Sequence, residues 1–136
     1  TSTAFEITKS GVGETTVIGI GGDAFIGTTP VDLLPLFEQD PETKMVVMFG
    51  EIGTSHEENA ADYIKEGRFT KPVVAYIAGR HAREGMRFGH AGAIVEEGKG
   101  TAASKISALE NAGVHVAKHF PEIGKLAREA LNASKR

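Results

Sequence analysis

The sequence contains no cysteine and no tryptophan, and it has no long hydrophobic run. The absence of cysteine excludes a disulfide framework, a thiolate metal site, an iron–sulfur cluster and a cysteine nucleophile. No stretch approaches the roughly 20 consecutive apolar residues of a membrane helix, and no charged and apolar leader precedes the first strand-like segment. We therefore expect no membrane partner, no targeting segment and a cytoplasmic location.

An excess of charge of either sign is also absent. The chain has 15 Lys and Arg against 18 Asp and Glu, a net charge of −3, and the two signs are interleaved. No extended basic face is therefore available for nucleic acid or anionic lipid. A length of 136 residues with 40% hydrophobic residues is typical of one compact domain.

Glycine is the residue in surplus. It occupies 17 of the 136 positions, nearly twice the share of roughly 7% in average proteins. The glycines fall between apolar segments rather than in a low-complexity tract. Glycine in such places lets the backbone come close to another group.

Four short apolar or β-branched segments predict strands that are buried on both faces of a parallel sheet. They are residues 15–20, 44–49, 72–77 and 114–117. Helical spacing is found between them and at both ends, at residues 1–9, 30–39, 55–65, 101–113 and 121–133. Ser55 and Thr101 are expected to be N-caps, and Gly113 is expected to be a C-cap.

This alternation predicts an α/β fold with a doubly wound, flavodoxin-like, mostly parallel sheet and helices on both faces. We expect a single domain over residues 1–136. A flavodoxin-like sheet has five strands, and the chain starts at Thr1 in helix-like sequence. We therefore expect one more strand ahead of Thr1, in a longer subunit.

The long loop at residues 79–100 is the first candidate for chemistry. Ligands of open α/β sheets bind beyond the carboxyl ends of the strands, and a loop of this length in a compact domain is usually functional. His90 lies in it between Gly89, Ala91 and Gly92. These small neighbours leave the imidazole accessible and allow backbone amides to approach an anion. The loop also contains arginines whose role the sequence does not assign, Arg80, Arg83 and Arg87.

Glu51 lies at the end of the neighbouring predicted strand, so the fold brings its carboxylate to the same rim as His90. A carboxylate that accepts the proton of one imidazole nitrogen makes the other nitrogen a better nucleophile. The pair is therefore a candidate for nucleophilic catalysis. The alternatives are a surface histidine, and for Glu51 a solvated acid or a capping contact to the helix after Ser55.

These motifs resemble, in one order over nearly the whole chain, the carboxyl-terminal domain of the α subunit of succinyl-CoA synthetases. Those proteins belong to the nucleoside-diphosphate-forming acyl-CoA synthetase family. The matching segments are residues 17–23, 36–43, 50–53, 70–74, 89–94 and 98–102. The histidine motif with a glutamate motif about 40 residues upstream makes the resemblance specific. Thr54 follows Gly53 where the family has another glycine.

The resemblance implies that ATP or GTP phosphorylates His90, which then passes the phosphoryl group to a carboxylate, preferably succinate. CoA attacks the resulting acyl phosphate. Glu51 matches the glutamate that orients the histidine, and the residues expected to bind phosphate are Gly22, Gly53, Gly89, Ala91 and Gly92.

The resemblance also implies partners. The nucleotide and its Mg²⁺ bind to an ATP-grasp β subunit, and CoA binds to a Rossmann-like domain that precedes this one. We therefore expect a hetero-oligomer, no metal site in this chain and no ligase turnover from the chain alone. The expected location is the cytoplasm, or the mitochondrial matrix in a eukaryote.

Two alternatives remain open. Residues 65–72 and 88–90 also resemble ATP-citrate lyase, which uses the same phosphohistidine on citrate, so the domain could serve citrate cleavage or citryl-CoA formation. The other alternative is a non-catalytic assembly module whose loop binds an anion.

Overall fold

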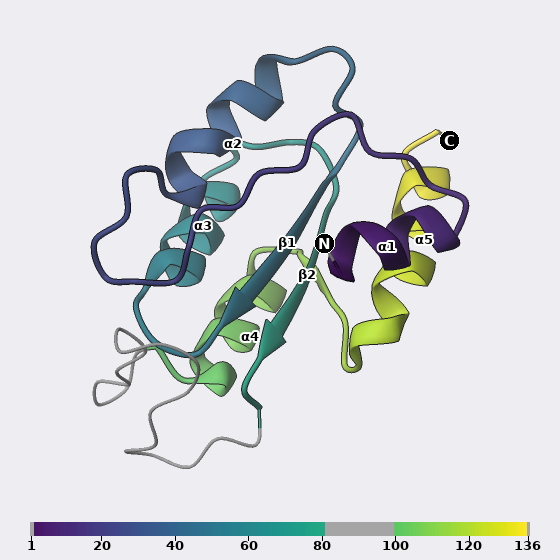
Figure 1. Cartoon of the computed structure of the whole chain (residues 1–136). Helices are drawn as coiled ribbons and strands as arrows, with labels where there is room; N and C mark the ends of the chain where they lie inside the picture. The colour runs from purple at the N-terminus through teal and green to yellow at the C-terminus, as the bar shows by residue number, and fades with distance from the viewer. Residues whose placement is uncertain (1, 81–99, 136) are drawn as a thin grey trace.

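A computed structural model of the chain describes residues 2–80 and 100–135 (Figure 1). Its elements are α1 (Ser2–Lys9), α2 (Pro30–Gln39), β1 (Val46–Glu51), α3 (His56–Lys65), β2 (Val73–Ala78), α4 (Ala102–Asn111), β3 (His115–Val116), the 3₁₀ helix η1 (Phe120–Glu122) and α5 (Ile123–Ala133). The described strands form one parallel sheet in the order β1-β2-β3. The predicted flavodoxin-like α/β class is confirmed.

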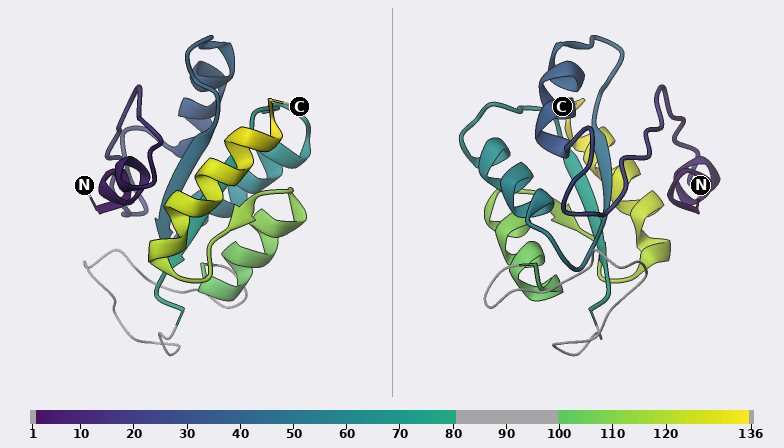
Figure 2. Two further views of the ribbon diagram at one scale, coloured as in Figure 1. Left: turned by 90° about the vertical axis from the view of Figure 1, so that its right-hand side faces the viewer. Right: turned by 60° about the vertical axis from the view of Figure 1, so that its left-hand side comes forward.

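Helices cover both faces of the sheet, because successive strand residues point to opposite faces and both sets are apolar. On one face, Ala75 and Ile77 of β2 pack with Leu109 of α4 in a core that also includes α2 and α3. On the other face, Ile7 of α1 and the α5 helix pack near Tyr76. Figure 1 shows α2, α3 and α4 on one side of the strands and α1 and α5 on the other, and Figure 2 shows the same layers from two other directions.

The predicted helices are all present, with small differences at their ends. Thr29 starts α2 through a capping box, since its backbone N–H and its hydroxyl both donate to the Asp32 carboxylate, at 2.8 and 2.7 Å. Thr101 caps α4 as expected, because its hydroxyl oxygen accepts the Ser104 N–H at 3.0 Å. The longest described helix, α5, has 11 residues. None of the described helices is long and apolar enough to cross a membrane.

Of the two other predicted caps, Ser55 differs from the structure and Gly113 is confirmed. Ser55 precedes α3 but its side chain makes no capping hydrogen bond. Gly113 lies one residue beyond the cap of α4, which is Ala112, and has a φ of +83°. Glycine in this left-handed position after a helix is a common way of ending it. The Gly113 and Val114 N–H groups donate to the carbonyl oxygens of Glu110 and Leu109, both at 3.0 Å, so Gly113 ends α4 as predicted.

The predicted strand at residues 15–20 is wrong. These residues form no strand, and the described parts of the chain contain three strands instead of the four predicted. Val17 and Ile18 are 68% and 48% exposed. β-Branched residues favour a strand only where a neighbouring strand accepts their backbone hydrogen bonds and another layer covers their side chains. Neither condition is met here among the described residues.

Gly124 allows α5 to lie directly against α1. A Cβ at this position would overlap the carbonyl oxygen of Glu6 and come within 2.8 Å of the Ser10 Cβ. We expect Gly124→Ala to push α1 away and to lower the free energy of unfolding by about 1–3 kcal/mol, as overpacking does. Chemical denaturation measures this change. Gly13→Ala is the control, since a Cβ at Gly13 has nothing within 4 Å, and equal effects of the two substitutions would contradict the prediction.

Candidate functional site

Glu51 is the last residue of β1, and the register pairs it with Ala78, the last residue of β2. Because the strands are parallel, both carboxyl ends lie at one edge of the sheet, where the two arrowheads end in Figure 1. The segment that follows β2 therefore leaves the sheet beside Glu51. That segment carries the predicted residues His90, Gly89, Ala91 and Gly92, which lie outside the described residues.

The first residue described after that segment, Gly100, also contacts the turn that follows Glu51. The Gly53 N–H donates to the Gly100 carbonyl oxygen at 2.7 Å. Gly100 has a φ of +79°, and a Cβ there would lie 3.0 Å from the Thr54 carbonyl oxygen, so this approach depends on glycine. The structure thus brings together Glu51, Gly53 and both ends of the segment that contains His90.

The start of the segment is held by the neighbouring elements. Arg80 donates from Nη2 to the Ala117 carbonyl oxygen at 2.6 Å, beyond β3. Gly79 has a φ of +91°, and a Cβ there would lie 2.7 Å from Cγ2 of the buried Ile52. The sequence assigned Arg80 no role, and the structure gives it an anchoring contact.

Gly22 lies in a neighbouring turn. The carbonyl oxygen of the next residue, Asp23, accepts a hydrogen bond from Nε2 of His56 at 3.0 Å. His56 is the first residue of α3, just after the turn that holds Gly53 and Thr54. This contact links the predicted phosphate-binding turn at Gly22 to the same region.

A buried ion cluster of Lys105, Glu57 and Glu58 lies under the turn after Glu51, and the sequence analysis missed it. The side chain of Lys105 is fully buried, contacts the Glu57 carboxylate and is 3.0 Å from the Glu58 carboxylate. Lys105 lies three residues after Ala102 and four before Leu109, both buried. A lysine at that helical spacing on an apolar face was the signal that could have revealed the cluster.

The cluster affects the ionisation of Glu58. Burial raises the pKa of this carboxyl, but hydrogen bonds from Lys105 and from the Gly100 N–H outweigh burial, so its pKa lies below the usual value. Glu58 is therefore a carboxylate at neutral pH.

Thr54 adopts a φ of +52°, the only described residue other than glycine with a positive φ. This conformation is unfavourable for a β-branched side chain by about 1–2 kcal/mol. Glycine relieves the strain but loses about 0.5–1 kcal/mol through its larger unfolded-state entropy. We expect Thr54→Gly to raise Tm by about 2–4 °C, corresponding to a net gain below about 1 kcal/mol. Thr54→Ala keeps a Cβ and should gain less in thermal unfolding, and a lower Tm for Thr54→Gly would contradict the prediction.

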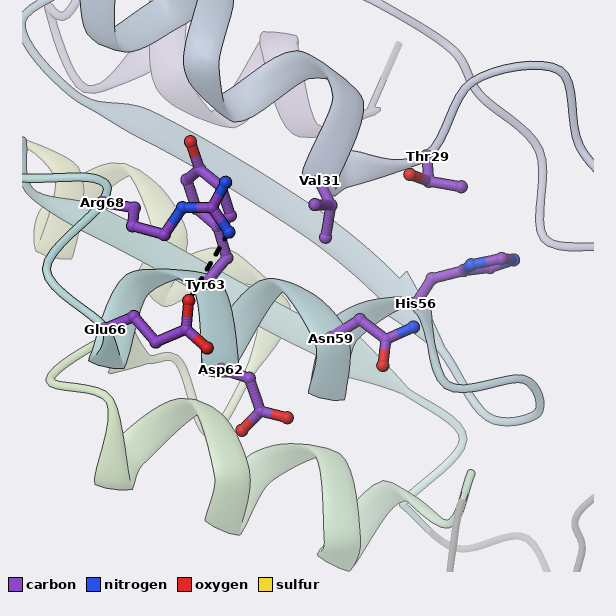
Figure 3. A pocket seen from close by; sticks show the side chains of 8 residues that line it. All are labelled: Thr29, Val31, His56, Asn59, Asp62, Tyr63, Glu66 and Arg68. Atoms are coloured by element: carbon purple, nitrogen blue, oxygen red, sulfur yellow. Dashed lines mark hydrogen bonds and ion pairs between the residues drawn. The ribbon is translucent and has the colours of Figure 1, made fainter.

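A groove of about 300 Å³ lies between the start of α2 and one side of α3 (Figure 3). Its walls include two carboxylates, Asp62 and Glu66, and a guanidinium, that of Arg68, which is 4.2 Å from the Tyr63 ring centroid. Arg68 also pairs with Glu66 at 3.5 Å. The groove has no excess of positive charge that would favour a phosphate.

The described residues also contain no group of three or more His, Asp or Glu residues able to hold a metal ion.

Comparisons with known proteins agree with this arrangement of motifs. The family model described as CoA-ligase matches residues 1–115. The alpha 2 subunit of an ADP-forming succinate–CoA ligase from Archaeoglobus fulgidus is 56% identical over 128 residues, which are 94% of this chain and 44% of that subunit. A subunit of an ADP-forming sulfoacetate–CoA ligase from Bilophila wadsworthia is 50% identical over 126 residues, which are 93% of this chain and 43% of that subunit.

A solved structure with the same fold is ATP citrate lyase from Methanosaeta concilii, in complex with (3S)-citryl-CoA. It superposes with a TM-score of 0.77 at 33% identity, over 83% of this chain and 19% of that one. The chain thus spans less than half the length of these relatives. The CoA-ligase family model matches residues 1–115, and more than half of the aligned residues are identical to those of an α subunit. The chain therefore belongs to the CoA-ligase family.

Proposed function

We propose that the chain is the phosphohistidine-carrying domain of a nucleoside-diphosphate-forming succinate–CoA ligase. The complete enzyme converts ATP or GTP, succinate and CoA into succinyl-CoA, nucleoside diphosphate and phosphate, reversibly. Relatives named as succinate–CoA ligase subunits, 56% and 49% identical to the chain, support succinate as the carboxylate.

One observation carries the proposal. Glu51 pairs in register with Ala78, and the turn after Glu51 bonds to Gly100, so the segment with His90 leaves and rejoins the described chain beside this carboxylate. A histidine that must accept and release a phosphoryl group needs such a neighbour, because a carboxylate fixes the imidazole tautomer and stabilises the cationic ring.

In this proposal His90 acts in two transfers. A ring nitrogen attacks the γ-phosphorus of the nucleotide, the bond to the β-phosphate oxygen breaks, and nucleoside diphosphate leaves. A succinate carboxylate oxygen then attacks the same phosphorus, which frees the imidazole and forms succinyl phosphate. The CoA thiolate attacks the acyl carbon and expels phosphate. Glu51 holds the proton on the other ring nitrogen throughout.

Backbone amides near His90 are expected to hold the phosphoryl group. Their positions are Gly22, Gly53, Gly89, Ala91 and Gly92. The turns at Gly22 and Gly53 are joined through the contact of Asp23 with His56. Small residues leave amide N–H groups accessible to phosphate oxygens.

The proposal requires partners outside this chain. We expect an ATP-grasp β subunit to hold the nucleotide and its Mg²⁺, and a Rossmann-like domain of the same longer subunit to hold CoA. Two surfaces support a longer subunit. Phe49 on the edge strand β1 is 51% exposed, and Val17 and Ile18 are 68% and 48% exposed without a strand partner among the described residues. We expect further parts of the longer subunit to cover these side chains. We expect the cytoplasm, or the mitochondrial matrix in a eukaryote, as the location.

The test is to assemble the full α subunit with its β subunit and to add ATP or GTP labelled at the γ-phosphate. We expect acid-labile, alkali-stable label on this domain, which is the behaviour of phosphohistidine. Succinate and CoA together should discharge it. Absence of covalent label in an assembled complex that binds phosphate would favour a non-catalytic, anion-binding module instead.

Citrate is the second candidate substrate, because the superposed structure is an ATP citrate lyase. The sulfoacetate ligase relative adds a third carboxylate to the comparison. Each acid is offered separately to the phosphorylated complex with CoA, and the loss of label is timed. Faster discharge by citrate or by sulfoacetate than by succinate would replace the succinate assignment.

A further inference from the structure

The buried ion cluster of Lys105, Glu57 and Glu58 contacts both the turn after Glu51 and Gly100, the first residue described after the His90 segment. The Lys105 ammonium also donates to the carbonyl oxygen of Thr54 at 3.1 Å. Glu58 accepts the Gly100 N–H at 3.0 Å. The cluster therefore joins the turn after β1, the start of α3 and the chain that follows the His90 segment.

All three hydrogen-bond donors of the Lys105 ammonium have an acceptor. An ammonium has three N–H donors, and Lys105 has three acceptors, namely the carboxylates of Glu57 and Glu58 and the Thr54 carbonyl. Stability alone does not require such a group, because a buried ion pair can often be replaced by apolar side chains of similar volume without loss of stability. An ammonium supplies what an apolar side chain cannot, which is directed hydrogen bonds to the Thr54 carbonyl in the turn and to two carboxylates at the start of α3.

Glu57 connects the cluster to the strand end that carries Glu51. One Glu57 carboxylate oxygen accepts a long hydrogen bond of 3.4 Å from the Glu51 N–H. The same carboxylate fills the space beside Gly50, where a Cβ would overlap it. The Glu57 side chain thus contacts the backbone of both Gly50 and Glu51, so its position affects where the end of β1 lies.

We propose that Lys105 is a positioning residue for histidine phosphorylation, which holds the turn after Glu51 against Gly100 in a single arrangement. This inference rests on the proposed function. The strained φ of +52° at Thr54 fits this role, since the Lys105 bond to the Thr54 carbonyl helps to maintain it. Lys105 acts through Glu51 and the turn, without itself touching the phosphoryl group.

The experiment uses the complete α–β complex and single-turnover labelling from γ-labelled ATP. Lys105→Met leaves the buried carboxylate of Glu57 and the partly buried carboxylate of Glu58 without their cation, so it is expected to lower Tm as well as the rate. The triple substitution Lys105→Met, Glu57→Gln and Glu58→Gln removes both charges and should recover most of the Tm. We expect the triple variant to remain about 10–100-fold slower than wild type in phosphorylation, because a small misplacement of a reacting pair has effects of this size. The KM for ATP should stay unchanged, since the nucleotide binds to the partner.

A double-mutant cycle with Glu51→Gln separates positioning from general structural support. If Lys105 acts through Glu51, the triple substitution should slow phosphorylation far less in the Glu51→Gln background than in wild type. Lys125→Met is the matched control, because Lys125 is exposed and forms only a 3.8 Å pair with Glu129; it should label at the wild-type rate.

The outcomes distinguish a failure of the proposed function from a failure of the proposed role of Lys105. A wild-type complex that takes no label defeats the proposed function and this inference with it. A wild-type complex that labels while the triple variant labels equally fast overturns the role of Lys105 alone. Fully additive losses in the double-mutant cycle also overturn it, since they place Lys105 outside the action of Glu51.

Discussion

His90→Asn is expected to abolish phosphorylation of the domain in the complete α–β complex. Asparagine is close in size and polarity, but its amide nitrogen has no available lone pair and cannot attack phosphorus. Loss of a catalytic nucleophile lowers kcat by as much as about 10⁶-fold in well-studied enzymes. Label from γ-labelled ATP should therefore fall to background, and net succinyl-CoA formation should stop with it.

The control is His115→Asn. His115 lies on β3 and its side chain is exposed, and β3 is separated from β1 by β2 in the sheet. This variant should retain both label and turnover. Label that survives in His90→Asn would remove the phosphohistidine from the proposal, and equal loss in the two variants would point to a general effect on folding.

Local signals sufficed to predict most of the fold. The helix α4 begins just after Thr101, the N-cap that the sequence predicts. The helix α2 begins at Pro30, as its helical spacing predicts, although its capping box with Thr29 was not among the predicted caps. The strands β1 and β2 coincide with apolar segments that are covered on both faces. The failure at residues 15–20 has a different cause. A strand needs a neighbour, and the sequence of a segment does not say whether that neighbour is present.

For the candidate site, only the placement of Glu51 can be compared with the structure, because His90 lies outside the described residues. Glu51 could be placed near the His90 segment because parallel strands end at a common edge, and the register of Glu51 with Ala78 agrees with that placement. Lys105 could not be linked to this edge, since its partners Glu57 and Glu58 are 48 and 47 residues away. A pairing over such a separation depends on how α3 packs against α4, which is decided by the assembled core.

Glu51→Gln has the second largest expected effect. Glutamine has nearly the same volume, so the turn and the core should remain intact, but its neutral amide cannot stabilise a positively charged imidazole or fix the tautomer of the ring as a carboxylate does. We expect single-turnover phosphorylation to slow by about 100-fold or more, by analogy with loss of the carboxylate next to a catalytic histidine. Thermal unfolding of the variant should match wild type.

The control is Glu129→Gln on α5. Glu129 is an exposed acid that pairs loosely with Lys125 at 3.8 Å. Its replacement changes the net charge by the same amount as Glu51→Gln, but at a residue on α5 and not at the end of β1. Unchanged phosphorylation in both variants would exclude Glu51 from the mechanism. A slow Glu51→Gln with an unaltered KM for ATP and an unaltered Tm would place the carboxylate at the transfer step itself, because nucleotide binding and folding would then both be intact.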